Sequence, residues 1–115
     1  MNKDKAIEFV KHKIVALKDD ADHEESVEQN ELAAKKLKCE IEDFEKVLDC
    51  LVNNTEDPYN NSLNFIWDKI SVIEDSLLDE EDRTKRYMLD CDLKEYQNIE
   101  SCLNYKMLKE IFDVE

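Results

Sequence analysis

The sequence predicts an all-α protein, a four-helix bundle made of two tandemly duplicated helical hairpins. Three observations predict it: there is no glycine and a single proline, apolar residues recur every three or four positions along four segments, and the two halves of the chain resemble each other. Tight β-hairpins and phosphate-binding loops depend on glycine for positive φ, so its absence argues against both. Charged residues make up 40% and hydrophobic residues 42% of the 115 residues, a composition typical of amphipathic helices around one core.

Four apolar stripes predict four helices. The first stripe ends before an acidic segment and the second begins in a different phase, so the chain must turn between them. The only segment dense in turn-forming residues, NNTEDPYNNS, separates the second stripe from the third. The predicted helices lie near residues 3–21, 26–53, 58–78 and 80–113. The residues predicted to start helices are Ser26 with Gln29 as a capping box, Asp57 with Pro58, and Asp79 or Asp82.

The internal similarity goes beyond helical periodicity. Residues 37–51 (LKCEIEDFEKVLDCL) align with residues 89–103 (LDCDLKEYQNIESCL) at an offset of 52, and both cysteines and both terminal leucines coincide. Residues 6–20 align with residues 62–76 at an offset of 56, where Phe, Lys, Ile and Asp recur at equivalent positions. A single hairpin cannot bury both of its stripes, whereas two packed hairpins can, with helices about 20° from antiparallel. The predicted units are repeat 1, about 3–53, repeat 2, about 58–113, and a linker, about 54–57, within a single helical domain, 1–115.

The net charge of −14 is concentrated in two segments. Residues 19–31 contain seven acidic residues and residues 74–82 contain six, and neither segment contains Lys or Arg. Both segments lie where paired helices connect, so an up-down-up-down bundle would gather them at one negative pole. Such a pole would repel bare phosphates, which argues against direct nucleic-acid binding. The candidate partner-binding residues are Asp19, Asp20, Asp22, Glu24, Glu25, Glu74, Asp75, Asp79, Glu80, Glu81 and Asp82.

Two interpretations of this acidity stay open. In the first, the acidic residues occupy helix N-termini, where the helix dipole favours negative charge, and keep a small protein soluble. In the second, the pole docks onto the basic surface of a protein partner, imitating nucleic-acid phosphates and steered by its field.

Known catalytic and metal-binding patterns are weak in this sequence. Cys39, Cys50, Cys91 and Cys102 lack CxxC spacing and are expected to be free thiols off the core stripes, at a helix flank or a dimer contact. His12 and His23 are isolated, and nucleotide-binding loops would need glycine. Two ExxE pairs resemble the magnesium-binding elements of all-α nucleotide pyrophosphohydrolases, although in that family the acids come from two facing helices. The pairs are Glu28 with Glu31 and Glu42 with Glu45. We expect no enzyme, no catalytic residue, no cofactor and no metal.

Function is therefore expected to lie in protein binding. No apolar run reaches the roughly 18 residues that span a bilayer and no signal-peptide block begins the chain, so a cytoplasmic protein without a membrane partner is expected. The composition, rich in Lys, Asn, Ile, Asp and Glu, resembles that of small accessory proteins of phages and mobile elements in low-GC bacteria. That resemblance implies an inhibitor or adaptor that occupies a basic, nucleic-acid-binding surface of a host protein. The first alternative is a structural protein that self-assembles, as a homodimer, through the faces of the second and fourth helices. The second is a metal-dependent all-α nucleotide pyrophosphohydrolase.

Overall fold

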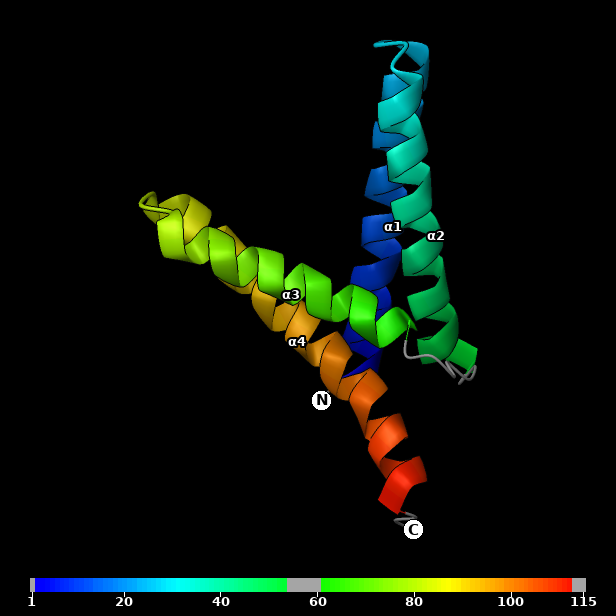
Figure 1. The fold of residues 1–115 in the computed structure, drawn as a ribbon, viewed down its shortest axis with the longest axis vertical. Coiled ribbons are helices and arrows are strands. Elements are labelled where there is room, and N and C mark those ends of the chain that lie inside the picture. The colour runs from blue at the N-terminus through cyan, green and yellow to red at the C-terminus, as the bar shows by residue number, and fades with distance from the viewer. Residues whose placement is uncertain (1, 54–60, 113–115) are drawn as a thin grey trace.

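The computed structural model describes residues 2–53 and 61–112, with side chains described as far as Asn104, and contains no strand in these ranges. It confirms the predicted all-α four-helix bundle built from two helical hairpins (Figure 1). Helices α1 and α2 form the first hairpin, and helices α3 and α4 form the second. Their bounds are Lys3–Ser26 for α1, Glu31–Asn53 for α2, Asn61–Asp79 for α3 and Arg83–Phe112 for α4. None of the helices in the described part of the chain is both long enough and apolar enough to cross a membrane.

The bend between α1 and α2 differs from the prediction. Helix α1 continues past residue 21 to Ser26, because backbone hydrogen bonding continues after its apolar stripe ends. Gln29 then adopts a positive φ of 53°, and the Asn30 side chain caps α2 by accepting a hydrogen bond from the Ala33 N–H at 3.1 Å. The predicted start of α2 at residue 26 and the capping box of Ser26 with Gln29 are therefore wrong.

The other predicted helix starts have different outcomes. The Asp82 carboxylate accepts a hydrogen bond from the Lys85 N–H at 3.1 Å, which confirms Asp82 as the cap of α4. Asp79, the alternative cap, is the last residue of α3, and α4 begins at residue 83 instead of 80. The predicted cap Asp57, the adjoining Pro58 and the linker at 54–57 lie outside the described residues.

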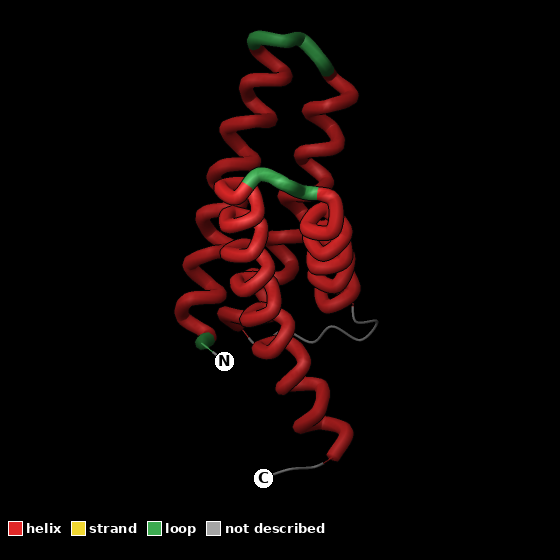
Figure 2. The backbone as a smooth tube through the Cα atoms, turned by 90° about the vertical axis from the view of Figure 1, so that its left-hand side faces the viewer, coloured by secondary structure: helices red, strands yellow, loops and turns green. Residues whose placement is uncertain are grey.

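The two hairpins cross instead of lying side by side (Figures 1 and 2). Within each hairpin the helices run antiparallel, as predicted, but the hairpins meet near the end where α2 leads to α3 and diverge toward their bends. The molecule measures 52 × 32 × 23 Å. The prediction that all helices lie about 20° from antiparallel, with both bends at one pole, is therefore wrong.

The distribution of apolar side chains explains this divergence. The five largest fully buried side chains, Val10, Phe44, Val47, Ile66 and Ile99, come from all four helices and pack where the hairpins cross. Beyond the crossing, each hairpin extends as a separate arm that ends at its bend (Figure 1). Large apolar residues near the bends are exposed, so no apolar contact holds the two arms together there, and both bends are acidic. The exposed residues near the bends are Val27, Leu32, Leu78, Tyr87 and Met88.

Candidate functional site

The predicted partner-binding residues form two separate groups, at the ends of two arms (Figure 1). The first acidic end consists of Asp19, Asp20, Asp22, Glu24 and Glu25, all on α1. The second acidic end consists of Glu74, Asp75 and Asp79 on α3, and Glu80, Glu81 and Asp82 in the connection to α4. The structure brings together the residues within each group but does not join the two groups into one surface.

Most of these acids lie toward helix C-termini, and three of them are in the last turn of their helix. Eight of the eleven lie in the C-terminal part of α1 or α3, while only residues 80–82 precede a helix. The helix dipole places partial negative charge at a C-terminus, so the acids in a last turn, Glu24 and Glu25 of α1 and Asp79 of α3, are destabilising. The part of the first interpretation that places the acids at helix N-termini is therefore wrong for the acids on α1 and α3 and holds for Asp82, the cap of α4, while a role in solubility stays a prediction.

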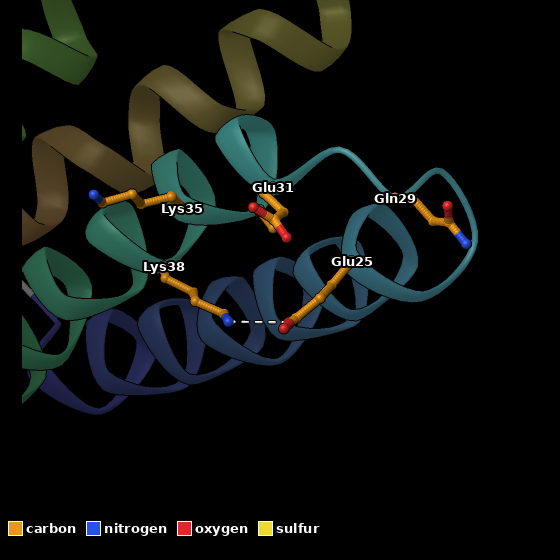
Figure 3. Close-up of a pocket in the computed structure, with 6 residues that line it drawn as sticks. Glu25, Gln29, Glu31, Lys35 and Lys38 are labelled. Carbon is orange, nitrogen blue, oxygen red and sulfur yellow. Dashed lines mark hydrogen bonds and ion pairs between the residues drawn. The ribbon is translucent and has the colours of Figure 1, made fainter.

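Basic residues of α2 partly compensate the first acidic end. The Lys38 ammonium group donates to the Glu25 carboxylate at 3.0 Å, in a pair that is about half exposed. Figure 3 shows this pair beside an open hollow beneath the bend. The hollow is lined by Glu25, Gln29, Glu31, Ala34, Lys35 and Lys38. Because the lining carries both signs of charge, the hollow favours no single ionic ligand.

The second acidic end contains a structural arginine that the sequence analysis missed. The Arg86 guanidinium donates to the backbone carbonyls of Leu77 at 2.8 Å and Glu80 at 2.9 Å, groups that the end of α3 leaves without helical partners. Glu80 accepts a hydrogen bond from the Asp82 N–H at 3.1 Å, and Asp82 caps α4. A base in the first turn of α4, directly after an acidic run, was the signal that could have identified Arg86.

Eight of the eleven predicted residues have side chains without a hydrogen bond or ion pair among the described residues. Glu25, Glu80 and Asp82 make the contacts given above. The remaining carboxylates are exposed, apart from Glu24, which is half-buried. These eight are Asp19, Asp20, Asp22, Glu24, Glu74, Asp75, Asp79 and Glu81.

The cysteines are free thiols in two environments. Cys39 and Cys91 are exposed, whereas Cys102 is half-buried and Cys50 is buried. The Cys50 sulfur lies 3.7 Å from the Ser62 hydroxyl, inside the contact between α2 and α3. The prediction that all four lie off the core is therefore wrong for Cys50, which packs between hairpins and is not exposed for a dimer contact. Burial raises the pKa of the Cys102 thiol.

The acidic ExxE pairs do not face a second acidic pair. Glu45 pairs with Lys18 at 3.9 Å and Glu28 with His23 at 3.5 Å, while Glu42 is exposed. Among residues 2–53 and the described part of the second hairpin, no group of three or more His, Cys, Asp or Glu side chains is arranged to hold a metal ion.

Neutralising an acid at a helix C-terminus should stabilise the protein. Asp79→Asn removes a negative charge from the last residue of α3, so the free energy of unfolding should rise by about 0.3–1 kcal/mol at low ionic strength. The matched control is Asp4→Asn, because Asp4 lies in the first turn of α1 and its replacement should have the opposite sign. Urea denaturation measures both. Equal effects of the two variants would contradict the dipole argument.

Comparisons with known proteins give no relative. Neither protein-family models nor curated proteins nor solved structures match this chain.

Proposed function

We propose that this chain is a non-enzymatic binding protein whose two acidic ends dock onto a basic surface of a protein partner. The observation that carries the proposal is the set of eight carboxylates that the protein's own bases leave without a partner. Two of them, Glu24 and Asp79, lie in the last turn of a helix, where they reduce stability. Residues that lower stability without an internal contact are best explained by a contact outside the molecule.

The kind of partner follows from the charge and from the divergence of the arms. Two negative ends on separate arms suit a basic surface that extends over a groove or around an edge, as nucleic-acid-binding surfaces do. Charge of this kind accelerates association and favours basic partners over others. The composition that resembles accessory proteins of phages and mobile elements fits an inhibitor or adaptor that occupies such a surface.

Capture experiments with charge-reversed variants test the proposal. The immobilised full chain is exposed to a lysate of a low-GC bacterium, and bound proteins are displaced with duplex DNA or with salt. Retained proteins should be released by DNA, which competes for a basic nucleic-acid-binding surface, and by 1 M salt, where the Debye length falls to about 3 Å. The first variant is Asp19→Lys with Asp20→Lys and Asp22→Lys, and the second is Glu74→Lys with Asp75→Lys and Asp79→Lys.

Each variant should retain about tenfold less of these proteins, a difference of roughly 1.4 kcal/mol in binding. The control replaces three exposed acids away from both bends and changes the net charge equally: Glu8→Lys, Glu42→Lys and Asp68→Lys. Circular dichroism verifies that each variant is helical. If the control lost the same proteins as the two variants, or if both variants retained them, the acidic ends would not be the binding surface.

A further inference from the structure

Two ring contacts that join the hairpins are copies of each other. Phe9 of α1 meets Tyr96 of α4 edge-on, with ring centroids 5.2 Å apart and an interplanar angle of 86°. Phe65 of α3 meets Phe44 of α2 with centroids 4.9 Å apart and the same angle. Phe9 and Phe65 are equivalent at the offset of 56, and Phe44 and Tyr96 are equivalent at the offset of 52. The first helix of each hairpin therefore contacts the second helix of the other in the same way.

The first of two equivalent lysines reinforces the contact of α1 with α4. Lys13 lies 5.5 Å from the Phe9 ring centroid and 4.0 Å from the Asp92 carboxylate. The ring face attracts the ammonium group, and the carboxylate of the opposite hairpin neutralises it.

The second lysine occupies the equivalent place between α3 and α2. Lys69 lies 5.4 Å from the Phe65 ring centroid and forms an ion pair with Glu40. Lys69 is the counterpart of Lys13, and Glu40 is the counterpart of Asp92. The same three-residue arrangement of ring, lysine and carboxylate thus occurs twice.

Burial follows the same pairing. The counterparts Val10 and Ile66 are both fully buried, as are Val47 and Ile99, and Ile14 and Ile70 are each 7% exposed. We call the contact of α1 with α4 and of α3 with α2 the junction. Because equivalent residues of the two hairpins form it, the junction resembles an isologous interface, in which both partners use the same surface. None of these contacts depends on the two hairpins belonging to one chain.

We propose that the junction surface of each hairpin also accepts a hairpin from a second copy of this chain, so that two chains pair by exchanging hairpins. Within one chain the connection through residues 54–60 gives an effective concentration in the millimolar range, which favours the intrachain junction. Exchange becomes dominant when the intrachain junction is weakened or when the connection is too short to form it. Exchange of identical elements is a low-cost route to a dimer because it reuses native contacts.

A complementary pair of charge variants tests this proposal. Variant A carries Lys13→Glu and Lys69→Glu, and variant B carries Glu40→Lys and Asp92→Lys. In either variant alone, two side chains of like charge face each other at the site of each native pair, Lys13 with Asp92 and Lys69 with Glu40. In an exchanged A–B dimer, each hairpin of A packs against a hairpin of B. Each introduced glutamate of A then faces an introduced lysine of B. The native pairs Lys13 with Asp92 and Lys69 with Glu40 each form once between the chains. Both variants keep a negative net charge, so overall attraction does not favour mixing.

An equimolar mixture of A and B should sediment with twice the mass of the monomer and show a higher Tm than either variant alone. The control mixture combines Lys11→Glu and Lys35→Glu with Glu8→Lys and Glu42→Lys, at exposed positions outside the junction, and should remain monomeric. A monomeric A–B mixture whose components keep their separate Tm values would overturn the proposal.

A second measurement covers the case in which A or B does not fold. Deleting residues 55–60 leaves a single residue, Asn54, between the two hairpins, and a very short hinge connection favours exchange between chains, while all junction residues stay native. The expected product is a dimer with the helicity of the full chain. A helical monomer or an unfolded chain from this deletion would contradict exchange.

Discussion

Replacing Phe44 with alanine should lower the free energy of unfolding by about 3–5 kcal/mol. The side chain is 1% exposed and lies at the centre of the crossing, in an edge-on contact with Phe65 and 6.5 Å from the Tyr96 ring centroid. Its removal leaves a cavity that hairpins crossing at one place cannot easily close. Since domains of this size are stable by only about 5–15 kcal/mol, the variant should be close to unfolding. Urea denaturation followed by circular dichroism measures the loss.

The matched control for this substitution is Leu78→Ala. Leu78 is 83% exposed near the bend of the second hairpin, so its truncation should change the free energy of unfolding by no more than about 0.5 kcal/mol. Similar losses for the two variants would mean that the crossing is not the main source of stability. Because the same residues join the hairpins, Phe44→Ala should also make their separation easier than Leu78→Ala does.

Periodicity predicted the core because burial in a helix follows its apolar stripe. Phe44, Ile66 and Tyr96 recur with the helical spacing of the predicted stripes, and all three are buried at the crossing. The internal repeat was also predicted from the sequence. The structure adds that equivalent residues of the two repeats occupy equivalent places in the contact between the hairpins. Residues that match at the two offsets, such as Phe9 and Phe65, make the same contacts with the opposite hairpin.

The arrangement of the hairpins could not be predicted from periodicity. A stripe shows which face of a helix is buried but not how far along its length a neighbour covers it. The large apolar residues near the bends, such as Leu32 and Tyr87, are exposed, so the contact between the hairpins ends before the helices do. For the same reason the end of a stripe at Ala21 did not mark the end of α1.

Side-chain roles at the bends were likewise hidden in the sequence. Asn30 and Asp82 both cap helices, yet only the second was predicted, because Ser26 with Gln29 offered a competing capping box. The candidate site was predicted as a list of residues but not as a shape. Charge composition identifies acidic segments, whereas the crossing of the hairpins decides whether those segments form one surface or two.

Stability at alkaline pH should depend strongly on Tyr96. Its ring is 5% exposed, and burial, assisted by the nearby Asp92 and Glu40 carboxylates, raises its pKa well above the usual range. An unfolded chain releases this proton near pH 10, while the folded protein retains it. The titration of Tyr96 therefore leaves the free energy of unfolding unchanged below that pH and lowers it by about 1.4 kcal/mol per pH unit above it. Tyr96→Phe removes the ionisable group, so the variant should be more stable than the wild type by about 2 kcal/mol at pH ~11.5.

The comparison isolates Tyr96 because the two proteins share every other ionisable group. Near neutral pH the phenylalanine keeps the ring contacts with Phe9 and Phe44, so the two proteins should have similar free energies of unfolding there. Tyr87→Phe is the matched control, since the Tyr87 ring is 71% exposed and the variant should follow the wild type at every pH. If the free energy of unfolding fell equally with rising pH in Tyr96→Phe and the wild type, the buried phenol would not be the cause of instability at alkaline pH. A selective gain for Tyr96→Phe would show that the crossing of the hairpins must exclude charge to stay closed.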